Sequence, residues 1–194
     1  MAQCKTSPEV GGMGHSVKRK EDPRFIRGQG NYVDDVVRPG MVFMDIVRSP
    51  YAHAKIKSIN TEKALAHPGV AAVITGETLK EYNLHMMPTL MSDTQMVLPI
   101  EKVCYQAQEV AAVIATDRYS AADGVELVEV EYEPLPVVVD PHKATDPDAP
   151  IIRDDKEGQD SNHIFHWEAG DKKGTDDVFK KADVVVKENI YLPR

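Results

Sequence analysis

The sequence has few of the residues that mark secreted or membrane proteins. Its 194 residues include only 2 cysteines, Cys4 and Cys104, and aromatic residues make up 6%. So few cysteines exclude a disulfide-rich secreted scaffold and favour free thiols in a reducing compartment. No apolar run approaches the roughly 20 residues that cross a bilayer, and the N-terminus lacks the apolar stretch of a secretory signal. We therefore expect a cytoplasmic protein with no membrane span.

The composition is otherwise that of an ordinary globular protein. Hydrophobic residues make up 42% and charged residues 28%, which excludes a disordered chain. The length suffices for one substantial domain with an appended arm. The formal net charge of -8 disfavours nucleic acid as a partner. Aromatic residues interleave with the basic run at 18–27 only as Phe25 and Tyr32, so we expect no nucleic-acid partner.

The segment SVKRKEDPRFIRGQGNYVDD, residues 16–35, reverses the sign of the charge locally. Its cations are Lys18, Arg19, Lys20, Arg24 and Arg27. Such a segment suits an acidic or carbonyl-rich surface. Pro23 favours an extended backbone before it, while Gly28 and Gly30 permit a turn. Because few core-type residues accompany them, we predict an extended N-terminal arm over residues 1–40 with a turn at 28–30.

From residue 41 onward the apolar pattern alternates between strand and helix periods. The run EVAAVIAT at 109–116 has the small and β-branched residues of a central strand. Thr61 and Asp117 are suited to cap helices, while Pro134 and Pro136 confine their stretch to a sheet edge or a loop. The pattern predicts strands over 42–47, 54–59, 70–75, 109–116, 128–133, 163–168 and 184–190, and helices over 61–66, 77–81, 118–128 and 175–182.

Two stretches break this alternation. Residues 82–101 are the least regular and are predicted to be a loop, and the acidic, turn-rich residues 146–159 are predicted to be an exposed crossover. The whole pattern indicates an α+β (mixed α/β) domain with a mixed sheet over residues 41–194.

Glycine-rich and histidine-containing stretches invite a ligand-binding interpretation. Gly28-Gln29-Gly30 and Gly11-Gly12-Met13-Gly14 lack the G-x-G-x-x-G pattern between a strand and a helix, and no G-K-[ST] follows. His163 and His166 would point to opposite faces of a strand, and no cysteine or carboxylate completes a zinc set. Neither a phosphate loop nor a structural zinc site is predicted.

The remaining reactive side chains also favour structural roles. Cys104 has apolar neighbours, which favours an inert buried thiol over a nucleophile, and Cys4 has no base close in sequence. Asp34 and Asp35 point apart on an extended chain, which favours capping or pairing with the arm's arginines over acid–base chemistry. Since no nucleophile, base and oxyanion site assemble, we predict no catalytic, cofactor-binding or metal-binding residue in this chain.

The run RKEDPRFIRGQGNYVDD resembles the entry to the large, molybdopterin-binding subunits of the xanthine dehydrogenase and aldehyde oxidase family. In that family an R-x-E-D-x-R-F-x-x-G-x-G-x-Y-x-D-D pattern leads into an α/β hammerhead domain. Later blocks continue the resemblance to the end of the chain: MVFMDIVRSPYAHAKIKSINTEKA, HPGVAAVITGETL, QEVAAVIATDRYSAADGVELVEVEYEPLPVVVDP and WEAGDKKGTDDVFKKADVVVKE. Within the family, residues 83–98 and 162–176 look most like the aerobic, molybdenum-copper carbon monoxide dehydrogenases.

The resemblance implies that this chain is a structural, non-catalytic part of an oxidoreductase. The full subunit would oxidise CO with water to CO2 at molybdenum and copper held on molybdopterin cytosine dinucleotide. A medium subunit with FAD and a small subunit with [2Fe-2S] clusters would accept the electrons. The family's G-G-G-F-G segment, its arginine-cysteine loop and its late glutamate base have no counterpart here, so the chain alone is expected to be inactive and to hold no cofactor.

Two alternatives fit the same residues. The first is the hammerhead of a hydroxylase that acts on an aldehyde, a purine or an N-heterocycle, since the substrate-reading residues of the family lie elsewhere. The second is a free-standing scaffold or binding module.

Overall fold

The computed structural model describes residues 18–89, 93–155 and 158–192. The chain divides into two compact units, one up to Met41 and one from Val42 onward.

Short helical turns order the first unit. α1 (Asp22–Phe25) begins next to Pro23, whose fixed φ suits a first helical turn, and η1 (Val33–Asp35) is a single 3-10 turn. The rings of Phe25 and Tyr32 stack with centroids 5.4 Å apart, and Gly28 forms the intervening turn with φ of 69°. The arm is therefore not extended throughout: helical turns interrupt it, and the predicted turn is centred on Gly28 rather than spread to Gly30.

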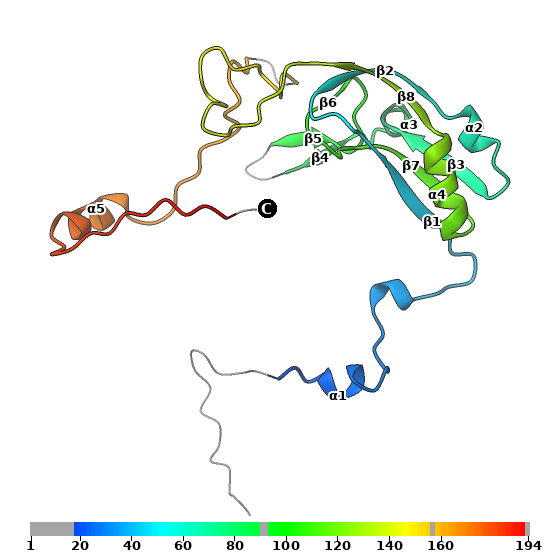
Figure 1. Ribbon diagram of the computed structural model, residues 1–194, viewed down its shortest axis with the longest axis horizontal. Coiled ribbons are helices and arrows are strands. Elements are labelled where there is room, and N and C mark those ends of the chain that lie inside the picture. The colour runs from blue at the N-terminus through cyan, green and yellow to red at the C-terminus, as the bar shows by residue number, and fades with distance from the viewer. Residues whose placement is uncertain (1–17, 90–92, 156–157, 193–194) are drawn as a thin grey trace, which may run out of the picture. The chain divides into compact units, whose positions relative to one another are not determined.

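A three-stranded sheet with β7 at its centre forms the middle of the second unit (Figure 1). Its order is β1 (Phe43–Arg48), β7 (Glu109–Ala115) and β3 (Val70–Thr75). Ala112 of β7 lies opposite both Ile46 and Ile74. The prediction that EVAAVIAT forms a central, buried strand is confirmed. Within β7 only Glu109 and Ile114 are half-buried, and the other residues are buried.

Two further sheets complete the strand pairing. One has the order β6 (Lys102–Val103), β2 (Ala54–Asn60) and β8 (Glu129–Pro134), and the other pairs β4 (Met86–Pro88) with β5 (Thr94–Met96). The α+β class is confirmed, but the single mixed sheet is corrected, because each pairing between described strands is antiparallel. Residues 82–101 also hold β4 and β5 instead of being loop throughout.

Strand β8 lies at a sheet edge. Pro134, which has no backbone N–H, is tolerated there because an edge strand pairs on one side only. Its outward side chains are acidic and pair with lysines: Lys57 with Glu133, and Lys63 with Glu129. Charges on an edge strand oppose the addition of a further strand.

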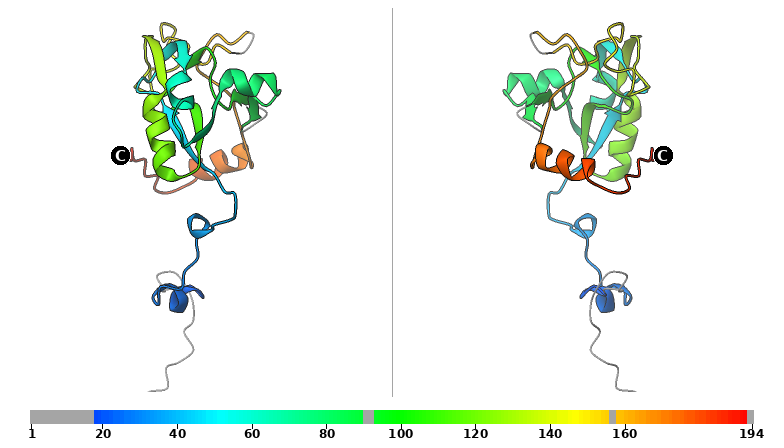
Figure 2. Two further views of the ribbon diagram at one scale, coloured as in Figure 1. Left: turned by 90° about the vertical axis from the view of Figure 1, so that its right-hand side faces the viewer. Right: turned by 90° about the vertical axis from the view of Figure 1, so that its left-hand side faces the viewer.

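Helix α4 (Arg118–Leu127) packs on β1 and β7 and closes the core (Figures 1 and 2). Figure 2 shows it as the light-green helix beside the strands. The predicted cap is confirmed: Asp117 accepts hydrogen bonds from the backbone N–H groups of Tyr119 and Ser120, both at 2.9 Å. These bonds lower the pKa of the Asp117 carboxyl, the bond from Ser120 being the largest cause. A Cβ on Gly124 would lie 2.7 Å from Val113, so glycine permits the close approach of helix and sheet.

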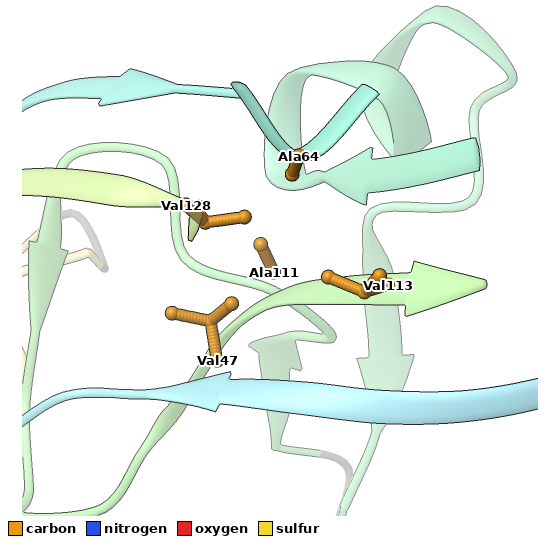
Figure 3. Packing of buried hydrophobic residues seen from close by; sticks show 5 residues of the cluster. All are labelled: Val47, Ala64, Ala111, Val113 and Val128. Carbon is orange, nitrogen blue, oxygen red and sulfur yellow. The ribbon is translucent and has the colours of Figure 1, made fainter. Parts of the chain in front are cut away.

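The main core consists of small aliphatic side chains. Figure 3 shows its five buried members, which converge between the sheets and the helices: Val47, Ala64, Ala111, Val113 and Val128. A second cluster consists of Ala54 of β2, Val103 of β6 and Val110 of β7.

Two short helices border this core. α2 (Glu62–Leu65) brings Ala64 into it, but its cap differs from the prediction. Thr61 makes no side-chain cap bond, and Asn60 Oδ1 instead accepts from the Glu62 N–H at 3.0 Å. α3 (Gly76–Glu81) is capped by Thr75, which accepts from the Thr78 N–H.

The last part of the chain contains one helix and, over its described residues, no strand. α5 (Lys172–Lys180) begins three residues before its predicted start and is capped by Asp171. The strands predicted over 163–168 and 184–190 are wrong. β-branched residues give a segment strand propensity, but a strand needs a neighbour to receive its backbone hydrogen bonds. Val184 and Val186 are each 78% exposed, so no neighbour covers them.

Candidate functional site

A cavity of about 420 Å³ lies in the second unit. Its walls are β5, β6, the loop after β6 and a crossover segment, residues 150–155, which we call the strap. The lining residues are Gln95, Met96, Pro99, Glu101, Lys102, Cys104, Tyr105, Gln108, Ile152, Arg153, Asp154 and Asp155.

Arg153 is the most connected side chain of the site. Its Nε and Nη2 donate to the two carboxylate oxygens of Asp155 at 2.6 and 2.7 Å. Nη2 also donates to the carbonyl of Thr94 at 2.8 Å, and Nη1 lies 3.6 Å from Asp93 Oδ2. The Arg153 hydrogen bonds are the main cause that lowers the pKa of Asp155, and they raise the pKa of Arg153. One guanidinium thus joins the strap to the start of β5.

Two other side chains hold the strap. Lys102 of β6 lies with its Nζ 2.5 Å from Asp154 Oδ1. Asn162 Oδ1 accepts from the Ile152 N–H at 2.8 Å, while its Nδ2 donates to the carbonyls of Ala144 and Pro150, both at 2.9 Å. The crossover predicted to be exposed is therefore partly packed, with Ile152 and Arg153 half-buried.

Cys104 lies beneath the strap as a protonated thiol. Its Sγ donates to the Ile152 carbonyl at 3.7 Å, and its N–H donates to Gln108 Oε1 at 2.6 Å. Burial raises the pKa of the Cys104 thiol, and this outweighs the lowering by Lys102 and Arg153. A thiol with a raised pKa is a poor nucleophile, which agrees with the interpretation of Cys104 as inert.

The other sequence candidates do not gather at this cavity. Cys4 and the glycines at 11–14 lie outside the described residues. His163 and His166 are exposed, and His166 Nε2 lies 3.1 Å from Glu168 Oε1. Asp35 Oδ2 accepts from the Tyr32 N–H at 2.9 Å, so the capping role predicted for this pair is confirmed for Asp35. Gly28 and Gly30 stand between short helical turns and not between a strand and a helix.

The cavity has the features of a binding or packing surface rather than of a reaction centre. Its cations are paired with carboxylates and its thiol is protonated. Over the described ranges, no group of three or more His, Cys, Asp and Glu side chains could hold a metal ion. Within those ranges, no helix combines the length and the apolar character that a membrane crossing requires. Sequence reasoning missed Arg153; the only local signal was its position before two aspartates.

Comparison with known proteins gives a consistent family. Residues 27–136 match the model described as "Aldehyde oxidase and xanthine dehydrogenase, a/b hammerhead domain". The carbon monoxide dehydrogenase large chain of Afipia carboxidovorans is 60% identical over 186 residues, which are 91% of this chain and 23% of that relative. The 6-hydroxypseudooxynicotine dehydrogenase complex subunit gamma of Paenarthrobacter nicotinovorans is 43% identical over 141 residues, covering 68% of this chain and 18% of that relative.

A solved structure agrees with the sequence comparison. The crystal structure of the Cu,Mo-CO dehydrogenase in its carbon monoxide reduced state matches with a TM-score of 0.73 at 60% identity, covering 89% of this chain and 23% of that chain. The chain spans about a quarter of the length of these carbon monoxide dehydrogenase chains.

Proposed function

Because this chain belongs to the aldehyde oxidase and xanthine dehydrogenase family, whose hammerhead domain it contains, we propose that it forms the hammerhead portion of the large subunit of an aerobic carbon monoxide dehydrogenase. The observation that carries this proposal is the 60% identity to such a large chain over 91% of the residues. The role of the portion is structural: it packs against the remainder of the large subunit and supports the cofactor-binding part.

For the complete enzyme we propose the cofactors and partner subunits that the family resemblance implies. The large subunit binds molybdenum on molybdopterin cytosine dinucleotide together with copper, and it oxidises CO and water to CO2. A medium subunit with FAD and a small subunit with [2Fe-2S] clusters receive the electrons. We also propose a cytoplasmic location, which the free thiol of Cys104 supports.

The described residues do not themselves fit a molybdenum group. They contain no cluster of potential metal ligands, and the two cations at the cavity, Lys102 and Arg153, are bound to carboxylates of the strap. We therefore assign no reaction step to this chain.

The degree of sequence identity favours carbon monoxide dehydrogenase over a hydroxylase for N-heterocycles or aldehydes. The carbon monoxide dehydrogenase chain is 60% identical, whereas the gamma subunit of Paenarthrobacter nicotinovorans is 43% identical and the aldehyde oxidase 1 of Oryctolagus cuniculus is 29% identical.

A segment exchange tests the proposal. The matching region of the Afipia large chain is replaced by this chain, and the chimera is expressed with the partner subunits of that enzyme. We expect assembly, a molybdenum content equal to that of the parent, and CO oxidation within a few-fold of the parent rate. A chimera that carries the matching region of the nicotinovorans gamma subunit is the control, and it is expected to assemble poorly. Failure of the first chimera to assemble, with the unmodified enzyme intact, would contradict the proposal.

The isolated chain is expected to contain no molybdenum and to reduce no dye with CO or an aldehyde. The physical reason is the absence of a suitable ligand set among the described residues. Elemental analysis and a dye-reduction assay on the purified 194-residue chain measure both properties. Stoichiometric molybdenum, or turnover above the blank, would mean that the chain holds a cofactor site of its own.

A further inference from the structure

The strap is held against the domain by side chains rather than by regular backbone pairing. Residues 150–155 belong to no helix or strand. Arg153 donates a hydrogen bond to the Thr94 carbonyl at the start of β5, and Lys102 forms an ion pair with Asp154. Asn162 accepts a hydrogen bond from the Ile152 N–H of the strap. Together these contacts close one wall of the cavity.

We propose that the strap is a latched cover of the cavity, that Arg153 is its latch, and that release of this one guanidinium exposes the cavity and the Cys104 thiol while the sheets stay folded. This inference does not depend on the proposed function of the larger subunit.

The distribution of burial supports a local opening. Arg153 and Asp155 both belong to the strap, so opening leaves their pair intact. Opening separates Arg153 from the Thr94 carbonyl and from Asp93, the Arg153 and Asp93 side chains being 19% and 9% exposed. It also separates Lys102 from Asp154, which is 63% exposed. The solvated Lys102–Asp154 pair contributes little net stability, because water replaces the lost partner, so the less exposed Arg153 contacts with Thr94 and Asp93 hold the strap more strongly. The core clusters of the second unit include no residue of the strap. Opening the strap therefore disturbs neither cluster, which is the condition for a local rather than a global transition.

The closed strap leaves a recess of a size that suits a small molecule or a side chain. A volume of about 420 Å³ lies within the range of ligand pockets, roughly 300–1,000 Å³. Met96, Pro99 and Ile152 supply apolar wall, and Gln95 and Gln108 supply amide groups. Because Arg153 and Ile152 are neighbours in the strap, movement of the latch removes one apolar wall at the same time.

Alkylation of Cys104 tests the latch directly. The chain carries Cys4→Ser, so that Cys104 is the single thiol, and the probe is N-ethylmaleimide, which is uncharged and is not attracted or repelled by the altered charge. We expect Arg153→Gln to raise the alkylation rate by at least about tenfold, because the charge-assisted hydrogen bond to the Thr94 carbonyl and the ion pair with Asp93, which favour only the closed form, are lost. Asn162→Ala is expected to raise the rate as well, since it releases the strap from its other side.

The controls separate opening from electrostatics and from unfolding. Arg153 lowers the thiol pKa, so its removal by itself would slow alkylation, and a faster rate must come from access. Lys143→Gln removes an exposed positive charge that precedes the crossover and lies outside the strap, and it should leave the rate unchanged. Alkylation rates measured in low urea should rise only slightly with urea if the opening is local, and steeply if it is global. An unchanged rate in both folded variants, or a steep urea dependence, would overturn the latch.

Discussion

Replacing Val113 with alanine is expected to lower the free energy of unfolding by about 2–3 kcal/mol. Val113 has no exposed surface and lies in the middle of β7, where it packs against the other members of the main core. The substitution removes two methyl groups and leaves a void that the neighbouring small side chains, Ala64 and Ala111, are too short to fill. Urea unfolding measures the loss as a shift in the midpoint at unchanged slope.

Val139 provides the matched control for this substitution. It carries the same side chain but is 84% exposed, so its replacement by alanine should change stability by less than about 0.5 kcal/mol. A loss below about 1 kcal/mol for Val113→Ala would contradict the central position of β7, because a buried aliphatic site costs more than that when it is truncated.

Gly76→Ala is expected to destabilise the domain by about 1–3 kcal/mol through overpacking. Gly76 begins α3, and a Cβ there would lie 2.7 Å from the Leu98 carbonyl oxygen and 2.9 Å from that of Pro99. Backbone carbonyls cannot rotate away as a flexible side chain can, so α3 or the segment before β6 must shift. This cost exceeds the gain in helix propensity of up to about 1 kcal/mol that alanine brings over glycine.

The neighbouring Glu77→Ala tests whether the effect of Gly76→Ala is steric. Glu77 is exposed in the same helix and lines no core cluster, and its replacement should leave the urea midpoint close to that of the parent. Equal stability of Gly76→Ala and the parent would show that the segment at Leu98 yields without cost.

The core elements could be predicted from the sequence because their local pattern and their tertiary environment agree. EVAAVIAT is small and β-branched, and it lies between two other strands, while Asp117 caps the helix that its position predicts. The hammerhead fold expected from the resemblance is confirmed as well. Ile114, in contrast, is only half-buried although its neighbour Val113 is fully buried, because successive side chains of a strand face opposite sides of the sheet.

The errors occur where the local sequence pattern of a segment disagrees with the tertiary neighbours that the segment has. Residues 184–190 have strand propensity without a described neighbour, and Met86–Pro88 pairs with Thr94–Met96 despite an irregular composition. The site was missed for a related reason. Arg153 binds the Thr94 carbonyl, which is far away in the sequence, and an acidic, turn-rich stretch gives no sign that its one arginine will be partly buried.

The pairing of β1 with β7 also has a consequence for synthesis on the ribosome. β1 ends at Arg48, whereas β7 begins only at Glu109. β3 also pairs with β7 and is also synthesised before it. At a translation rate of roughly 5–20 residues per second, β1 spends several seconds outside the ribosome with no partner strand. Met44 and Ile46 are then available to other nascent chains, and such non-local pairing is slow to form once β7 arrives. We therefore expect this region to recruit chaperones early during translation, before the sheet closes.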